Sequence, residues 1–186
     1  MVITNGRRLG LMKQNKPKKA LVLMTALLPT IGHKNLVNYA LNLMYSIHGF
    51  NSGEFQIQVL LSSRSYEPIN GLERILAFEE EFRDEINMEL IKFMHHEDDN
   101  VPQNPSDHND FWSVWRDIIH NYTDVREGDI VVSSETYGSK IAEVLGCEHY
   151  LYDINRKIED VRGTTVRNDI AWHFNDILPY FRRKLK

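Results

Sequence analysis

Cysteine is nearly absent from this sequence, and long apolar runs are missing from it. The one cysteine among 186 residues, Cys147, excludes an internal disulfide and a cysteine-rich metal site. No apolar run reaches the ~20 residues of a membrane-spanning helix, and the N-terminus lacks the apolar centre of a secretory signal. We therefore expect a soluble, cytoplasmic protein from a reducing compartment, without a membrane partner.

Basic residues are in slight deficit, and those near the N-terminus are clustered. The net charge is −4, but residues 1–20 carry six basic side chains and no acidic one, so that a tail of +6 leaves −10 for the rest. These residues are Arg7, Arg8, Lys13, Lys16, Lys18 and Lys19. An acidic body argues against a nucleic-acid partner. We expect a flexible basic tail at residues 1–18, either solvated or touching polyanions. A single domain is expected at 19–186, because 42% hydrophobic composition is enough for one sizeable core.

Strand and helix patterns alternate along the chain. Short apolar runs with the character of buried strands lie at 19–27, 55–63, 90–94, 128–134 and 149–154. Apolar residues at helical spacing predict helices at about 36–47, 70–86, 111–122, 137–146 and 177–186. The helix over 70–86 is expected to face the core with Leu72, Ile75, Leu76, Phe82 and Ile86, and Asp176 can cap the last helix. The alternation predicts an α/β fold: a parallel five-stranded sheet with helices on both faces and ligands at the carboxyl ends of the strands.

The common phosphate loops are also missing, since the chain contains neither GxxxxGK[ST] nor GxGxxG. A different turn, LPTIGH at residues 28–33, leads from the first strand into the first helix. Gly32 lets a phosphate approach the backbone at the positive end of that helix, and Thr30 and His33 add a hydroxyl and an imidazole. An ordinary helix cap with a solvated ring is the alternative.

A second turn of similar composition lies near the C-terminus, in VRGTTVRNDI at residues 161–170. Gly163 stands before a helix start, where Thr164 can act as the cap and Arg167 can hold a polyphosphate. A capped surface helix with a structural arginine is the alternative. Because this turn follows the fifth strand and LPTIGH follows the first, the two can flank one crevice at the strand ends.

A long polar loop is expected at residues 95–109, and loops of this length are typically functional or disordered. It begins with HHEDD at 95–99. We expect a solvated turn there and no metal site, because the segment offers no helical i, i+4 pair of ligands.

Several of these segments resemble one enzyme family. Residues 30–33, TIGH, look like the (H/T)xGH motif of the nucleotidyltransferase superfamily, and residues 163–167, GTTVR, look like its C-terminal element. The segments 61–78 and 131–146, and the order of DINR before the second motif, resemble nicotinamide mononucleotide adenylyltransferases. They are most similar to the adenylyltransferase domain of bacterial NAD-biosynthesis regulators. The resemblance covers about residues 20–183 and implies a Rossmann-like fold. The chain departs from the family pattern at Met24 (family Gly), Ala26 (family Phe), Pro29 (one residue late) and Arg162 (family Ser).

The resemblance implies transfer of AMP from ATP to nicotinamide mononucleotide, with Mg²⁺ carried by the ATP phosphates and no protein metal site. His33, Thr30 and Arg167 are the implied catalytic residues. The implied ATP-binding residues are Ala26, Leu27, Gly32, Ser133, Ser134, Gly163, Thr164 and Thr165. For the second substrate we expect Arg64 at its phosphate and Trp112, ahead of Trp115, stacked on its ring. The alternatives are a solvated arginine and two tryptophans that belong to the core.

Two other functions stay open at this point. A cytidylyl- or adenylyltransferase could act on another phosphorylated small molecule. A nucleotide-binding sensor without turnover would explain the altered first motif. The sequence is compatible with a homo-oligomer as well as with a monomer.

Overall fold

The computed structural model describes residues 16–50, 53–153, 161 and 163–186, so most of the predicted basic tail lies outside the described residues. Its sheet contains five parallel strands in the order β3-β2-β1-β4-β5. The strands are β1 (Lys19–Met24), β2 (Gln56–Ser63), β3 (Ile91–Glu97), β4 (Ile130–Ser133) and β5 (Glu148–Leu151). The predicted α/β architecture is therefore confirmed, with β1 and β4 adjacent at the centre, where the strand order reverses.

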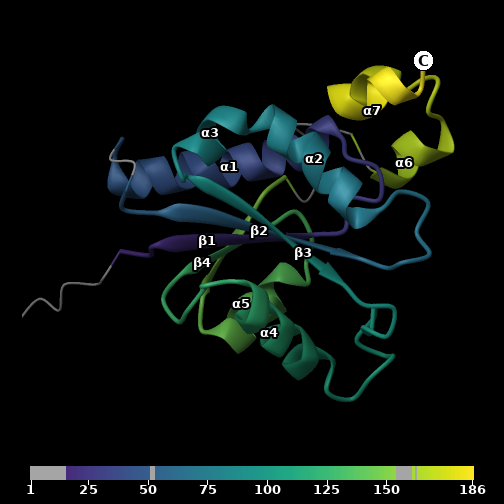
Figure 1. Ribbon diagram of the computed structural model, residues 1–186. Helices are drawn as coiled ribbons and strands as arrows, with labels where there is room; N and C mark the ends of the chain where they lie inside the picture. Colours follow the sequence, from purple (N-terminus) through teal and green to yellow (C-terminus); the bar gives the residue numbers. More distant parts are fainter. Residues whose placement is uncertain (1–15, 51–52, 154–160, 162) are drawn as a thin grey trace, which may run out of the picture.

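Helices cover both faces of this sheet (Figure 1). On one face lie α1 (Ile31–His48), α2 (Gly71–Glu81) and α3 (Arg83–Asn87), and on the other lie α4 (Phe111–Tyr122) and α5 (Gly138–Leu145). The C-terminal part contains α6 (Gly163–Asn168), a 3₁₀ turn (Phe174–Asp176) and α7 (Pro179–Lys184). None of the helices in the described ranges combines the length and the apolar character that crossing a bilayer requires.

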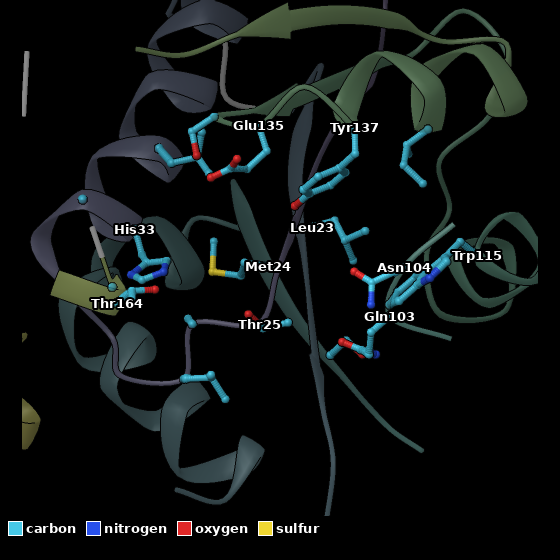
Figure 2. A pocket seen from close by; sticks show the side chains of 18 of the residues that line it. Leu23, Met24, Thr25, His33, Gln103, Asn104, Trp115, Glu135, Tyr137 and Thr164 are labelled. Atoms are coloured by element: carbon cyan, nitrogen blue, oxygen red, sulfur yellow. The ribbon is translucent and has the colours of Figure 1, made fainter. Parts of the chain in front are cut away.

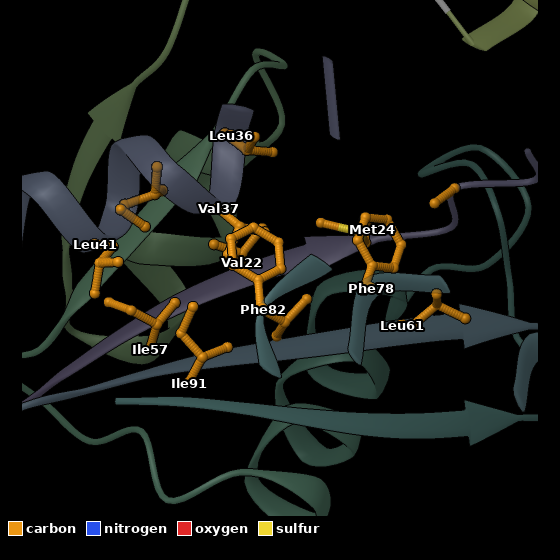
Figure 3. Packing of buried hydrophobic residues seen from close by; sticks show 14 of the residues in the cluster. Val22, Met24, Leu36, Val37, Leu41, Ile57, Leu61, Phe78, Phe82 and Ile91 are labelled. Carbon is orange, nitrogen blue, oxygen red and sulfur yellow. The ribbon is translucent and has the colours of Figure 1, made fainter. Parts of the chain in front are cut away.

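The three central strands, β1, β2 and β4, are buried on both sides, which explains their continuous apolar sequence, whereas β5 at the edge has no buried residue. In β1, Ala20, Val22 and Met24 pack toward α1 and α2, while Leu21 packs toward α4 and α5. Figure 3 shows the first of these cores, in which the rings of Phe78 in α2 and of Phe82 just after it lie over the sheet. Phe78 stacks on Phe93 of β3 with 5.6 Å between ring centroids. Burial on both faces fixes the position of these strands along their axes, and this determines where their carboxyl ends lie.

The predicted core stripe of the helix over 70–86 is partly wrong. The chain breaks at Phe82 into α2 and α3, and Leu72 and Leu76 are 58% and 50% exposed. The buried face instead carries Arg74 and Phe78, both fully buried. Buried positions 71, 74, 75 and 78 also have helical spacing, so periodicity alone did not distinguish the two faces.

The end of the third strand also differs from the prediction. His95 and His96 belong to β3, where they pair in register with Leu61 and Ser62 of β2. The strand continues because β2 supplies backbone partners as far as Ser63. His96 is buried, so the first two residues of HHEDD are not a solvated turn.

The C-terminal segment braces the first turn of the fold. Asp176 does not cap α7, which begins after Leu178; it instead lies 2.8 Å from the Nδ1 atom of His173. Thr30 and Ile177 form an isolated antiparallel bridge, and the Leu178 amide donates to the Pro29 carbonyl at 3.0 Å. The turn that precedes α1 is thus held by backbone contacts to residues more than a hundred positions later in the sequence.

A serine, a histidine and a glycine make a tight joint where β4 meets α5. Ser133 donates to the Glu135 carbonyl at 2.8 Å, and its Oγ lies 2.9 Å from Nε2 of His149 on β5. A Cβ atom on Gly138 would lie 2.0 Å from the Ser133 Oγ. Only glycine therefore fits at this helix start.

The same joint occurs in the other half of the sheet, where β2 leads to α2. The Oγ of Ser63 lies 2.7 Å from Nε2 of His95 on the neighbouring strand β3. A Cβ atom on Gly71 would lie 2.0 Å from that nitrogen and 2.4 Å from the serine oxygen. Both helix starts are therefore seated on a serine and histidine pair.

The buried imidazole of His96 and the half-buried imidazoles of His95 and His149 should make the stability of the protein depend on pH. Burial is the largest cause that lowers the pKa of His95, His96 and His149 below 6.5. The histidines of the unfolded chain bind protons at the ordinary pKa, whereas those of the folded chain bind protons only at lower pH. Protonation therefore favours the unfolded state, so the free energy of unfolding is highest above about pH 6.5 and falls below it. Urea unfolding at about pH 7.5 and pH 5.5 should show the lower midpoint at the acidic pH. A midpoint that stays constant over this range would contradict the burial of neutral imidazoles.

Candidate active site

A cavity of about 680 Å³ opens at the carboxyl ends of the strands. Its walls come from four segments: the turn between β1 and α1, the start of α6, the turn between β4 and α5, and the loop before α4. Figure 2 shows His33 and Thr164 at one end and Trp115 with Gln103 and Asn104 at the other. Met24 and Thr25 lie between the two ends. The cavity is thus elongated, with a hydrophilic end and an aromatic end.

Thr30 and His33 form the start of α1. Thr30 is fully buried as the N-cap residue; its amide donates to the Nδ1 atom of His33 at 3.2 Å, and its hydroxyl lies 2.8 Å from the same atom. Because a backbone amide only donates, Nδ1 of His33 must accept, and a neutral ring then carries its proton on Nε2. The cap therefore fixes both the orientation and the tautomer of the imidazole.

The second turn lies directly beside the first. A Cβ atom on Gly32 would lie 3.1 Å from the carbonyl oxygen of Val161. The position of a Cβ atom on Gly163 lies 3.2 Å from the Nη1 atom of Arg167 and 3.5 Å from the Cε1 atom of His33. His33 and Arg167, more than 130 positions apart in the sequence, therefore bring an imidazole and a guanidinium to the same glycine.

The start of α6 differs in detail from the prediction. The helix begins at Gly163, so Thr164 lies in its first turn and not at its cap. The Thr164 hydroxyl accepts a hydrogen bond from the Nη2 atom of Arg167 at 3.2 Å. Arg162 lies outside the described residues. The hydroxyl and the guanidinium thus form one unit, exposed at the hydrophilic end of the cavity.

Most residues expected to bind ATP line the cavity, and two do not. Ala26, Leu27 and Ser134 lie on its wall together with Gly32 and the pair of residues at the start of α6, Gly163 and Thr164. Ser133 does not lie there, because its hydroxyl is engaged by His149 and the Glu135 carbonyl beneath the turn. Thr165 is exposed and is not among the residues that line the cavity.

Of the residues expected at the second substrate, both tryptophans line the aromatic end and Arg64 does not. Trp115 is buried, and its Nε1 donates to the Pro102 carbonyl at 3.0 Å. Trp112 is half-buried and stands edge-on to Phe111, with ring centroids 4.8 Å apart. The Nη2 atom of Arg64 donates to the Val101 carbonyl at 2.8 Å, so its guanidinium supports the loop outside the cavity.

Several lining residues were not found from the sequence. Gln103, Asn104 and Pro105 come from the long polar loop, whose length was the available signal. Glu135 and Tyr137 come from the turn between β4 and α5, where the sequence carries no phosphate-binding signature. The Tyr137 hydroxyl points into the cavity in Figure 2. The residue is 41% exposed, but the loss of water around its hydroxyl raises the pKa to about 12, so the hydroxyl is a neutral hydrogen-bond donor.

The cavity walls offer few metal ligands. No group of three histidine, cysteine or carboxylate side chains suited to a metal ion occurs in the described part of the chain. Glu135 is the one carboxylate among the described lining residues. This donor set fits a magnesium ion that is held mainly by phosphate oxygens and water and contacts at most one protein carboxylate.

Comparisons with known proteins find similarity in structure alone. No family model matches the sequence, and no curated protein sequence matches it. The structure resembles a crystal structure of a NadR protein in complex with NR, with a TM-score of 0.56 and 18% identity over 90% of this chain and 45% of that chain. It also resembles a NadR protein in complex with NAD and AMP-PNP, with a TM-score of 0.57 and 18% identity over 90% of this chain and 46% of that chain. The present chain therefore spans less than half the length of these proteins, and it shares with that part the parallel α/β fold.

Proposed function

We propose that this protein is a nucleotidyltransferase that transfers the adenylyl group of ATP to nicotinamide mononucleotide, giving NAD and pyrophosphate. The observation that carries the proposal is the meeting of two distant turns at Gly163, which brings His33 and Arg167 to one end of one cavity. The solved structures of the same fold contain NR in one case and NAD with AMP-PNP in the other, which supports nucleotide ligands of this class.

The reaction needs positioning and charge stabilisation more than proton transfer. A phosphate oxygen of the mononucleotide forms a bond to the α-phosphorus of ATP, and the bond from that phosphorus to the bridging oxygen breaks, so pyrophosphate leaves with the electron pair. The attacking oxygen is already anionic, so it needs no general base. We assign the Nε2 proton of His33 to the α-phosphate, and Thr164 with Arg167 to the β- and γ-phosphates. A magnesium ion bound to the triphosphate would neutralise part of the developing charge.

Thr30 has a different part in this proposal from the one expected from the sequence. Thr30 lines the cavity, but its hydroxyl is buried and lies 2.8 Å from the Nδ1 atom of His33, so we assign it the role of holding the imidazole in place. At the opposite end of the cavity, Trp112 and Trp115 provide the aromatic surface that a flat, electron-poor nicotinamide ring requires.

The proposal predicts that purified protein with ATP and magnesium forms NAD only when nicotinamide mononucleotide is added. The measurement is NAD formed and pyrophosphate released, run in parallel with sugar phosphates and alcohol phosphates as acceptors and with CTP in place of ATP. If pyrophosphate release depends on another acceptor instead, the reaction type stands and the proposed acceptor, nicotinamide mononucleotide, is wrong. Calorimetric binding of ATP without product from any acceptor would instead support a nucleotide sensor.

A further inference from the structure

The largest fully buried side chain in the described structure is a charged one, Arg74 in the first turns of α2. Its Nη2 atom donates to the Glu67 carboxylate at 2.6 Å and also to the Ile69 carbonyl. Its Nη1 atom donates to the Thr25 carbonyl at 3.1 Å. A single planar guanidinium thus connects α2 and the loop before it to the turn that follows β1.

The Thr25 carbonyl belongs to a peptide in an unusual conformation. The next residue, Ala26, has φ +46°, a left-handed value that is unfavourable for a residue with a Cβ atom. Thr25 and Ala26 both line the cavity, whereas Arg74 is not among its lining residues. The strained peptide therefore has the guanidinium on one side and the cavity on the other.

The orientation of that peptide follows from its planarity. In a trans peptide the carbonyl and the following amide point in opposite directions, so a Thr25 carbonyl directed at Arg74 turns the Ala26 N–H away from Arg74. Within the described residues the Ala26 amide donates no hydrogen bond. It is therefore a fixed backbone donor on the cavity wall, of the kind that binds a phosphate oxygen.

We propose that Arg74 is a positioning residue, which orients the Thr25–Ala26 peptide so that the Ala26 amide donates to a phosphate of the bound nucleotides. This proposal rests on the proposed function. Glu67 neutralises the Arg74 charge at 2.6 Å, so the effect of Arg74 on the substrate is through geometry and not through its field. Lysine cannot replace it, because a point donor does not bond in a fork to two acceptors on different segments.

The test compares two variants that weaken the same ion pair from opposite sides. Arg74→Lys loses the bond to the Thr25 carbonyl, whereas Glu67→Gln keeps Arg74 and leaves that bond intact. Both should lower the thermal midpoint, since both disturb a buried pair. We expect Arg74→Lys to reduce kcat for NAD formation about 10- to 100-fold, because small misplacements of a donor have effects of this size. Glu67→Gln should stay within about 3-fold of the unchanged protein, since it keeps the geometry that sets this rate.

A second readout does not depend on turnover. In ¹⁵N-labelled protein, AMP-PNP with magnesium should shift the Ala26 amide resonance downfield, and the shift should be mostly lost in Arg74→Lys but kept in Glu67→Gln. Ala26→Gly removes the strain at positive φ but gives the peptide more conformational freedom. It should therefore lower kcat, because the amide is less well oriented, without lowering the thermal midpoint. Equal loss of kcat in both ion-pair variants, or an unchanged Ala26 shift in Arg74→Lys, would overturn the positioning role while wild-type NAD formation upholds the enzyme. If wild-type protein neither forms NAD nor shows a shift with AMP-PNP, the proposed function itself fails.

Discussion

Replacing His33 with alanine should lower kcat for NAD formation by about 100- to 1,000-fold while the protein stays folded. The reason is the fixed tautomer: Thr30 occupies Nδ1, so the Nε2 proton is oriented by the fold before any substrate binds. Loss of a preorganised donor to the reacting phosphate costs a few kcal/mol in the transition state. The measurement is the steady-state rate at saturating ATP and nicotinamide mononucleotide.

The same substitution removes part of the cap of α1, and this contribution has to be separated. Loss of a cap costs about 1 kcal/mol, which corresponds to a fall of about 2 to 4 °C in the thermal midpoint for a chain of this size. A protein destabilised by that amount remains folded at 25 °C. His33→Gln, which keeps a neutral N–H donor, should recover part of the rate, and His120→Ala, at an exposed position on α4, should change neither rate nor midpoint. Equal rates for His33→Ala and the unchanged protein would refute the mechanism.

Replacing Gly138 with alanine should cost about 3 kcal/mol or more of the free energy of unfolding, at the upper end of the range for overpacking. The new Cβ atom would lie 2.0 Å from the Oγ and 2.7 Å from the Cβ of Ser133, and 2.6 Å from Nε2 of His149. A helix position normally gains up to about 1 kcal/mol from this change, so the sign itself is informative. The shift should also displace Glu135 and Tyr137 and thereby raise KM, because both residues line the cavity.

Chemical denaturation measures this effect, and the chain offers a matched control. Gly53→Ala introduces the same methyl group where nothing lies within 4 Å, so the unfolding midpoint should stay constant or rise. Adding Ser133→Ala to Gly138→Ala removes the nearest atom and should recover part of the loss. A Gly138→Ala protein as stable as the Gly53→Ala protein would show that the joint between β4 and α5 is looser than these distances indicate.

Much of the fold followed from local pattern. The three central strands, which are buried on both faces, carry continuous apolar runs, and each of the five runs predicted from the sequence overlaps with one of the five strands. The first strand ends at Met24 and not at residue 27, because Ala26 at φ +46° has left the extended conformation. That early end was not predictable from apolar character, since Ala26 and Leu28 are as buried as strand residues.

The candidate site was predictable where it depends on residue type within a turn. Gly32, His33, Thr164 and Arg167 were identified from their positions around helix starts, and the structure brings them to one cavity. Residues whose role depends on distant partners were not accessible in this way. Ser133 stands beside a lining residue in sequence, yet His149 on another strand occupies its hydroxyl.

The burial of Arg74 shows why the remaining part could not be read from the sequence. On hydrophobicity alone, Leu72 and Leu76 of α2 are expected on the core face, but the structure buries Arg74 there and leaves both leucines exposed. Arg74 is buried because acceptors from two separate segments converge on it: the Glu67 carboxylate and the Ile69 carbonyl of the loop before α2, and the Thr25 carbonyl of the turn after β1. No local periodicity carries that information.

The repeated joint of serine, histidine and glycine also constrains how this sequence can diverge. In each half of the sheet the glycine of the helix start tolerates a side chain only if the serine or the histidine becomes smaller. Positions 133, 138 and 149 should therefore covary among descendants of this chain, and positions 63, 71 and 95 should covary as a second, independent triplet. Position 53, where a Cβ atom would meet nothing within 4 Å, should vary independently of both triplets.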